Sequence, residues 1–369
     1  MNAPLPPGPP LRATPKADVA DWSAFADRID VRSPGEYAED HVPGAVNLPV
    51  LDDAERARVG TMYVQQSAFD ARRAGAALVA RNIAHICETY VGDKPRDWSP
   101  LVYCWRGGQR SRALVHVLGE IGFRAVQLDG GYRGYRRHVV AMLAQWPRSV
   151  RFRVVCGLTG SGKSRLIDAI GYEGGQVLDL EGLARHRGSL LGERPDDPQP
   201  TQKMFESQLF AALAGFDREQ PVFVESESRR IGRLQLPDAL LDAMRASPCI
   251  RLEASRALRV AMLAADYAHW AKDPERLHAR LVALTPLHGK AAVARWIAWA
   301  SEGAATPLTE DLLDLHYDPL YERAIDRNFP RYRGATSVVV SDAAPATFRR
   351  LAQQLLAGRV QPDVYKDDR

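Results

Sequence analysis

The sequence predicts an α/β protein with two domains, each built on a parallel sheet. Short apolar strands alternate with amphipathic helical patterns, and two of these strands run directly into glycine-containing loops that start a helix. Such alternation is typical of parallel sheets covered by helices on both faces. A chain of 369 residues also exceeds the usual size of one domain. We expect a disordered Pro-rich lead-in at 1–17, a first domain at 18–140, a linker at 141–150, and a second domain at 151–369 with a helical C-terminal part.

In the first domain, alternating apolar and turn residues predict four short strands. We place three of them at 29–32, 101–103 and 125–128, and one where the turn at 41–49 leads into a short strand. Residues 51–97 have a mostly helical pattern, clearest at 71–86, and a further helix runs from 111 to about 122.

A cysteine occupies the turn between the third of these strands and the next helix, in the stretch LVYCWRGGQRS. Backbone N–H groups and the helix dipole in such a turn favour a thiolate at Cys104, and Arg106 and Arg110 add positive charge. Gly107 and Gly108 let the backbone curl inward without side chains that block the sulfur. A lone cysteine at a strand end is more often a small buried residue. The two arginines and two glycines favour a reactive cysteine.

The second domain opens with a strand at 152–156 that is followed directly by GLTGSGKS. This is the P-loop pattern GxxxxGKS in its proper context between a strand and a helix. Backbone N–H groups of such a loop wrap a phosphate chain at the helix N-terminus. Lys163 would pair with phosphate oxygens, and Ser164 would hold a magnesium ion if one is used. The other candidate phosphate-binding residues are Gly157, Thr159, Gly160, Ser161 and Gly162.

The rest of this domain again alternates between strands and helices. Strands are predicted at 177–180, 222–224, 249–252 and 337–340, and helices around 201–215, 255–271, 275–283, 289–300, 309–327 and 345–357. The second of these strands runs into Glu225-Ser226-Glu227, where P-loop proteins keep an acidic residue beside the metal. Glu225 is therefore a candidate for a magnesium shell together with Ser164. A solvated strand end is the alternative interpretation of both glutamates.

Composition limits the class of protein. Hydrophobic residues make up 46% and charged residues 25% of the chain, and no apolar run approaches the roughly 18 residues of a membrane span. The N-terminus has no apolar segment typical of a signal peptide. The four cysteines are far apart and form no CxxC pair, which argues against a structural metal site and a disulfide framework. We therefore expect a cytoplasmic protein with no membrane contact.

Positive charge is concentrated after the cysteine loop. Ten arginines lie between residues 104 and 153, against only Glu120 and Asp129. Arginine suits phosphate oxygens, so RNA is a candidate partner, with Arg133, Arg136 and Arg137 as candidate contacts. Solvated helix faces are the alternative on composition alone, and the position beside the reactive cysteine favours RNA.

Three stretches of the first domain resemble the signatures of rhodanese domains. They are DVRSPGEYAEDHVPGAVNLP, the Cys104 loop and LDGGYRGY, in that order. The resemblance implies a rhodanese-like fold and a Cys104 that carries sulfur or selenium as a persulfide or perselenide.

A rhodanese-like domain followed by a P-loop domain is similar to one family, the bacterial tRNA 2-selenouridine synthases. Further markers of the resemblance are DLEGLARHRGS at 179–189, ESESRRIG at 225–232 and YDPLY at 317–321. Ser226 departs from the pattern, which has an acidic residue between the two glutamates.

The resemblance implies a two-step exchange at the wobble 2-thiouridine in the anticodon arm of tRNA. A geranyl group first moves from geranyl diphosphate to the sulfur, and selenium from selenophosphate then replaces the geranylated sulfur. No tightly bound cofactor is implied. Two alternatives stay open: a tRNA sulfurtransferase that uses ATP at the P-loop, and a non-catalytic nucleotide-binding regulator.

Overall fold

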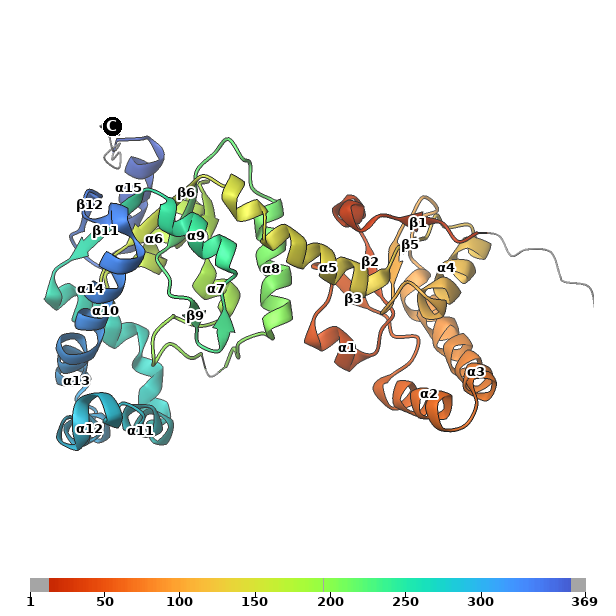
Figure 1. Ribbon diagram of the computed structural model, residues 1–369, viewed down its shortest axis with the longest axis horizontal. Helices are drawn as coiled ribbons and strands as arrows, with labels where there is room; N and C mark the ends of the chain where they lie inside the picture. Colours follow the sequence, from red (N-terminus) through yellow and green to blue (C-terminus); the bar gives the residue numbers. More distant parts are fainter. Residues whose placement is uncertain (1–12, 195, 360–369) are drawn as a thin grey trace, which may run out of the picture. The chain divides into compact units, whose positions relative to one another are not determined.

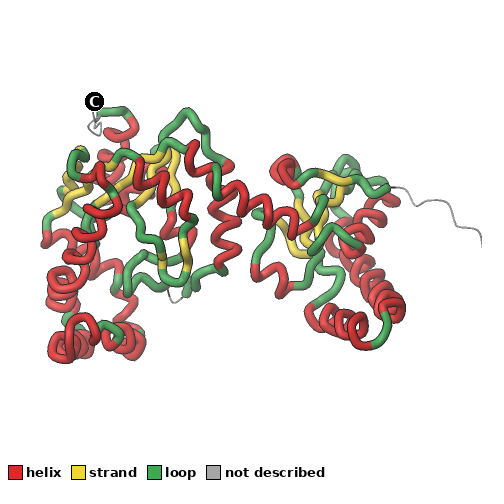
Figure 2. Tube along the Cα trace, viewed as in Figure 1, coloured by secondary structure: helices red, strands yellow, loops and turns green. Residues whose placement is uncertain are grey.

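The computed structural model describes residues 13–194 and 196–359, and the chain divides into two compact units between Met142 and Leu143. Each unit contains a five-stranded sheet in which every pair of neighbouring strands is parallel. Helices surround the strands in both units (Figure 1, Figure 2). The predicted α/β class with two parallel-sheet domains is confirmed.

The first unit contains five strands and the helices that connect them. The strands are β1 (Lys16–Ala17), β2 (Arg28–Asp30), β3 (Ala45–Asn47), β4 (Leu101–Tyr103) and β5 (Val126–Leu128). The helices are η1 (Val19–Ala24), α1 (Pro34–Glu39), α2 (Asp53–Gln65), α3 (Ala68–Ile86), η2 (Cys87–Val91), α4 (Gln109–Ile121) and α5 (Gly131–Leu143), which ends at the division between the units.

The second unit contains the P-loop sheet, a small hairpin and a larger set of helices. The strands are β6 (Phe152–Cys156), β7 (Gln176–Leu178), β8 (Val222–Glu225), β9 (Arg230–Ile231), β10 (Leu234–Gln235), β11 (Cys249–Ala254) and β12 (Thr336–Val340). The helices are η3 (Trp146–Ser149), α6 (Lys163–Tyr172), α7 (Leu180–Ala184), α8 (Gln202–Ala214), α9 (Asp238–Ala246), α10 (Arg256–Asp266), η4 (Ala268–Lys272), α11 (Pro274–Val282), α12 (Thr285–Ser301), α13 (Ala305–Leu312), η5 (Leu313–Tyr317), α14 (Asp318–Asn328), η6 (Pro330–Tyr332) and α15 (Pro345–Leu356).

The sheet of the first unit places the cysteine loop at its carboxyl edge. The strand order is β1-β5-β4-β2-β3, so β4 is flanked on both sides. Its three residues are fully buried, which explains why Leu101, Val102 and Tyr103 form an unbroken apolar run. Cys104 follows at the edge where the loops after parallel strands gather.

The sheet of the second unit has the order β12-β11-β6-β8-β7, so the strand before the P-loop lies in the middle. The P-loop after β6, Glu225 at the end of β8 and α7 after β7 therefore meet at one edge. Helix α6 packs against α15, and apolar residues such as Phe348 and Leu351 bury that interface.

Helices α11, α12 and α13 gather at one end of the second unit, apart from its sheet (Figure 1). They share a core of their own that includes Leu281 and Trp296. The helix expected at 289–300 begins at Thr285, with a kink at Gly289, whose φ is 80°. The helix expected at 309–327 consists of α13, the π-helical turn η5 and α14.

Several boundaries differ from the sequence-based expectations. Of the predicted lead-in, residues 1–12 lie outside the described residues, whereas Lys16–Ala17 form β1 and pair with β5. The stretch expected as a linker, 141–150, contains the end of α5 and the helix η3. Ser67 caps α3 and separates it from α2.

Helices α7 and α9 and the β9–β10 hairpin were not predicted from the sequence, and only turns were expected where α1 and the start of α5 lie. In the case of α9, the spacing of Leu240, Leu241 and Met244 is helical, so the pattern did contain the signal for this helix. Within the described residues, no helix is both long and apolar enough to cross a membrane.

Candidate functional sites

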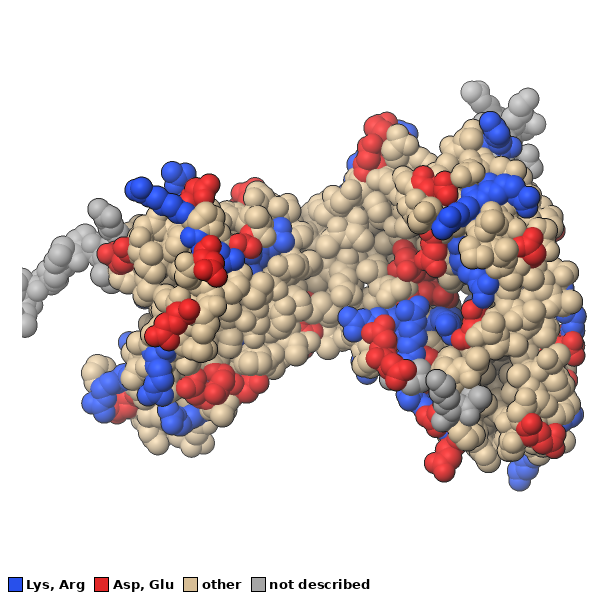
Figure 3. All heavy atoms as spheres, turned by 180° about the vertical axis from the view of Figure 1, so that it is seen from behind, with Lys and Arg blue, Asp and Glu red and all other residues tan. Residues whose placement is uncertain are grey.

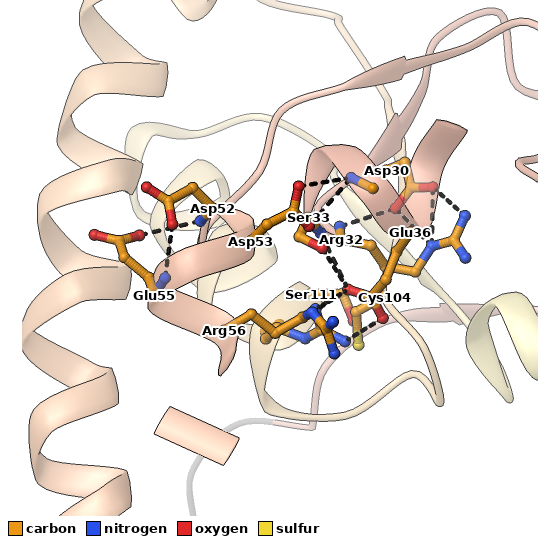
Figure 4. A network of polar contacts seen from close by, with 12 residues as sticks. Asp30, Arg32, Ser33, Glu36, Asp52, Asp53, Glu55, Arg56, Cys104 and Ser111 are labelled. Carbon is orange, nitrogen blue, oxygen red and sulfur yellow. Dashed lines mark hydrogen bonds and ion pairs between the residues drawn. The ribbon is translucent and has the colours of Figure 1, made fainter. Parts of the chain in front are cut away.

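Cys104 lies at the end of β4 with its sulfur enclosed by the loop that follows, and its side chain is 3% exposed. The Gly108 N–H and the Ser111 hydroxyl both donate to Sγ, each at 3.2 Å (Figure 4). The Ser111 hydroxyl also accepts a hydrogen bond of 2.7 Å from the Gln127 side-chain amide. The loop thus supplies hydrogen bonds to an anionic atom held at this position.

The close approach of another turn shapes this loop. Gly131, the first residue of α5, follows the turn after β5; its φ is +56°, and a Cβ there would lie 2.3 Å from Gly107 N and 2.4 Å from Cys104 O. Gly107 also has a positive φ, of +65°, and a Cβ there would press on the backbone of Leu128. At Gly108, by contrast, an added Cβ would meet no atom within 4 Å. A side chain at Gly108 would therefore not block the loop, contrary to expectation, whereas one at Gly131 would.

Alanine substitutions at Gly131 and Gly108 give a matched test of how tightly the cysteine loop is packed. Gly131→Ala should lower the free energy of unfolding by about 1–3 kcal/mol, because it combines a left-handed backbone with a backbone clash. Gly108→Ala should change it by less than about 0.5 kcal/mol, since its φ is −100° and the space is open. Urea denaturation of the full chain measures both. Equal destabilisation would show that the turn can move away from the loop.

The two arginines of the loop behave differently. Arg110 forms an ion pair of 2.8 Å with Glu36, a residue that also caps α1. Burial raises the pKa of Glu36, but the Arg110 guanidinium, the Ser33 N–H and the charge of Arg56 outweigh this and lower it below its usual value. Arg110 is thus already neutralised and does not offer an unpaired charge to the sulfur, contrary to the sequence-based expectation. Arg106 is exposed and forms no ion pair with the described residues.

A buried ionic network supports the wall beside the loop (Figure 4). Arg32 is 1% exposed and donates to both carboxylate oxygens of Asp30 and to the Asp40 carbonyl. Its guanidinium lies 3.9 Å from the ring centroid of Tyr132, whose hydroxyl donates to the Asp40 carboxylate at 2.8 Å. The Tyr132 N–H donates to the Cys104 carbonyl. This network joins the expected rhodanese signatures through side chains that meet only in the folded chain.

In the second unit, α6 begins at Lys163, and the P-loop turns in front of it. Lys163 Nζ donates to the Gly157 carbonyl at 2.8 Å and lies 5.4 Å from the ring centroid of Tyr321. The Gly157 N–H donates to the Tyr321 hydroxyl at 2.6 Å. Thr159, Gly160, Gly162, Lys163 and Ser164 line a cavity, while Ser161 is buried beneath the loop.

Carboxyl groups cluster behind the P-loop lysine. The Ser164 hydroxyl donates to Glu181 at 2.7 Å, and the Glu181 N–H donates to Glu225 at 2.9 Å. Burial, together with the charge of Glu181, raises the pKa of Glu225 well above its usual value. The carboxylate beside Ser164 is therefore that of Glu181, and the metal role expected for Glu225 is not supported by its position.

Glu227 lines the cavity wall near the same group. Burial, and then the charge of Glu181, raise its pKa to about 8. A carboxyl group that keeps its proton near neutral pH can donate a hydrogen bond to a phosphate oxygen instead of repelling it. Within the described residues, no group of three or more His, Cys, Asp or Glu side chains could hold a metal ion.

The cavity has a volume of about 420 Å³, and residues from all three family markers noted in the sequence line it. The marker 179–189 contributes Glu181, the marker 225–232 contributes Glu227, and the marker 317–321 contributes Tyr321. Ser226, the departure from the pattern, lies 3.2 Å from the Tyr321 hydroxyl. The markers therefore describe one site rather than three separate features.

This cavity is lined by both polar and apolar residues. The polar residues include those of the P-loop, the carboxyl groups of Glu181, Glu227 and Asp266, and the side chains of Arg187, His316 and Asn328. The apolar residues come mainly from α10, α14 and the segments next to them, namely Leu190, Met262, Leu263, Tyr267, Tyr317, Leu320, Ala324, Ile325 and Phe329. The site can hold a molecule with a phosphate group at one end and a hydrocarbon body at the other.

The candidate RNA contacts lie on α5. Arg133 and Arg137 are exposed, whereas Arg136 is partly buried and has an interaction partner. On the face drawn in Figure 3, the basic side chains of both units lie among acidic ones. A tRNA contact through these three arginines stays a prediction.

Sequence reasoning missed three residues of these sites. Ser111 was assigned only to a helix start, although a hydroxyl seven residues after a loop cysteine is within reach of it. Glu181 was part of a family marker but was given no role. Gly131 was seen only as a turn residue. All three depend on contacts between segments, which periodicity does not report.

The fold and the two sites define a protein in which a rhodanese-like domain with an intact cysteine loop precedes a P-loop domain. The family model described as a rhodanese-like domain matches residues 17–138, and the one described as a tRNA 2-selenouridine synthase AAA domain matches residues 150–279. The chain belongs to the tRNA 2-selenouridine synthase family.

Three relatives, each called tRNA 2-selenouridine synthase, show the extent of the likeness. The protein from Nitrosomonas europaea is 38% identical over 65% of this chain and 63% of its own length. The protein from Marinobacter nauticus is 36% identical over 65% of both chains. The protein from Salmonella newport is 32% identical over 81% of this chain and 89% of its own length. The first two alignments span less than two thirds of those relatives, so activity, substrates and partners are taken up below as proposals.

Proposed function

We propose that this protein is a tRNA-modifying transferase that converts wobble 2-thiouridine to 2-selenouridine. In the first step, the thiocarbonyl sulfur attacks the first carbon of geranyl diphosphate, and diphosphate leaves. In the second step, a selenium nucleophile derived from selenophosphate, with Cys104 as the selenium carrier, attacks the base carbon that bears the geranylated sulfur; the C–Se bond forms, the C–S bond breaks and the sulfur leaves as geranylthiol. Alkylation matters because a thiocarbonyl sulfur is a poor leaving group and an alkylated sulfur is a better one.

The observation that carries this proposal is the cavity at the P-loop, which combines phosphate-binding residues with a set of apolar side chains. Lys163 and the N-terminus of α6 provide positive charge at one end, where charge develops on a departing diphosphate. The apolar lining residues provide a surface for a prenyl chain. Family membership, with relatives named for 2-selenouridine synthesis, supports the same reaction.

Magnesium fits beside this site. The Ser164 hydroxyl and the Glu181 carboxylate lie 2.7 Å apart at the cavity wall, and hard oxygen ligands of this kind suit Mg²⁺. These two residues would hold the ion, which would neutralise part of the diphosphate charge. The protein's own part is to bind the phosphate chain through the P-loop and Lys163.

The cysteine loop supports the selenium step. Two hydrogen-bond donors meet Sγ of Cys104, and they would stabilise an anionic sulfur or selenium atom there. A non-catalytic regulator would have no need of this arrangement.

Analysis of tRNA nucleosides by mass spectrometry tests the proposed function. Cells that lack this protein should contain no 2-selenouridine, and the purified protein with geranyl diphosphate and selenophosphate should form it on tRNA that carries 2-thiouridine. An ATP-using sulfurtransferase would instead release phosphate from ATP in the presence of tRNA. Formation of 2-selenouridine without geranyl diphosphate would contradict the first step.

Binding of tRNA should depend on the arginines of α5. Reversal of Arg133, Arg136 and Arg137 to Glu should weaken the affinity and flatten its salt dependence. The log–log slope should fall by roughly one unit for each tRNA phosphate that no longer has a basic partner. Fluorescence anisotropy at a series of salt concentrations measures both quantities.

The control variant makes the same change of charge on α3, at Arg72, Arg73 and Arg81, which are also exposed. It should reduce affinity far less, since it removes only long-range attraction. An equal reduction in both variants would place the RNA contact elsewhere.

A further inference from the structure

A second cavity adjoins the P-loop cavity and is lined mainly by residues of helices α10 to α13 and of the segments between them. Its volume is about 130 Å³. Four residues line both cavities: Thr159, Leu263, Tyr267 and Tyr317. The second cavity, here called the inner pocket, therefore adjoins the phosphate site at these shared residues.

The inner pocket is lined mostly by carbon. Its other residues are Leu191, Ala264, Ala268, Trp270, Leu277, Trp299, Ala300, Gly303, Ala305, Leu308, Thr309 and Leu312. Polar atoms in this wall are already bonded within the protein: Trp270 Nε1 donates to the Leu191 carbonyl, and the Thr309 hydroxyl to the Ala305 carbonyl. None of these lining residues carries a charge, so the pocket suits a hydrocarbon group.

The tyrosines between the two cavities are held in place by Ser189. The Tyr267 and Ser189 hydroxyls lie 2.8 Å apart, Ser189 also hydrogen-bonds the buried Tyr317, and burial raises the pKa of Tyr267 to about 12. Their polar ends are thus occupied at the boundary, and their rings stay available to pack against a chain that passes from one cavity to the other.

The size of the inner pocket limits what it can hold. An apolar cavity of roughly 150 Å³ in another protein binds benzene, a six-carbon molecule. A pocket of about 130 Å³ is thus of the size of one five-carbon isoprene unit. The larger cavity has room for the phosphates and the first unit of the chain.

We propose that the inner pocket receives the terminal isoprene unit of a prenyl diphosphate whose phosphates lie at the P-loop, and so selects a ten-carbon chain. This inference rests on the proposed function. It adds the pocket that determines the chain length of the prenyl donor. A five-carbon donor leaves the inner pocket unfilled, and a fifteen-carbon donor exceeds it. Each missing methylene weakens binding by roughly 10-fold or more, and an extra unit extends beyond the apolar wall of the pocket and gains nothing from it.

Direct binding measurements on the full chain test this. The probes are pyrophosphate and the dimethylallyl, geranyl and farnesyl diphosphates, with five, ten and fifteen carbons. The wild-type protein should bind geranyl diphosphate at least about 100-fold more tightly than dimethylallyl diphosphate, and more tightly than farnesyl diphosphate.

Two variants should move this preference in opposite directions. Ala300→Phe fills the inner pocket and should lower geranyl affinity by about 100-fold while binding of dimethylallyl diphosphate and pyrophosphate persists, which also reports an intact P-loop. Trp299→Ala enlarges the pocket and should raise farnesyl affinity by about 10-fold or more. Ala298→Phe, on the exposed side of the same helix, is the matched control and should change nothing.

The outcomes separate this inference from the function on which it rests. If Ala300→Phe and the wild type bind geranyl diphosphate equally, the chain lies elsewhere and the inference is overturned, although the diphosphate site stands. If the wild type binds pyrophosphate but no prenyl diphosphate more tightly, the prenyl donor of the proposed function is overturned as well.

Discussion

Replacement of Cys104 by serine should abolish the formation of 2-selenouridine while the protein still folds and binds tRNA. Serine can accept the same hydrogen bonds from Gly108 N–H and Ser111, because its oxygen occupies almost the same position as the sulfur. A hydroxyl group, however, cannot carry selenium as a thiolate can. The measurement is the amount of 2-selenouridine in tRNA from cells that contain only the variant.

The other cysteines provide the controls. Cys87 lies in the same unit, and burial raises the pKa of its thiol, so Cys87→Ser should have little effect on the reaction. Cys156 and Cys249 are buried in strands and line neither cavity, and their serine variants should also remain active. Normal levels of 2-selenouridine in the Cys104→Ser cells would mean that selenium reaches the tRNA without a carrier on this loop.

The parts of the fold that the sequence predicted share a local signal. Strands β4 and β6 are unbroken apolar runs, and each is followed within a few residues by glycines and a helix start. Burial of the strand and the turn that follows are both decided by neighbouring residues, so a short window of sequence contains the information. This is why Cys104 and the P-loop could be located without the structure.

The parts that could not be predicted depend on which segments the sheets bring together. Arg110 was expected to act on the sulfur, but its partner Glu36 is 74 residues away and is brought near because β2 pairs with β4. Gly131 matters because β5 lies on the other side of β4. Glu181 rather than Glu225 meets Ser164, since α7 extends over the end of β8. None of these pairings follows from a local pattern.

Removal of the P-loop lysine should block the reaction at a different step. Lys163→Ala removes the side chain that is placed to meet the charge growing on the departing diphosphate, and deletion of one such interaction costs about 10²–10³ in rate. The rate of geranylation of 2-thiouridine should therefore fall by that factor, and selenium incorporation should fall with it because its substrate is missing. Lys290→Ala, an exposed lysine on α12, is the control and should leave both steps intact.

Supply of tRNA that is already geranylated distinguishes the two sites. It should restore 2-selenouridine formation in Lys163→Ala, because the second step needs no diphosphate, but not in Cys104→Ser. Mass spectrometry of the product tRNA from each purified variant reports the result. If geranylated tRNA does not rescue a Lys163→Ala protein that is folded and binds tRNA, the P-loop also serves the selenium step or binds a nucleotide that both steps need. The asymmetry between the two variants thus decides whether the P-loop and the cysteine loop act on successive steps of one reaction.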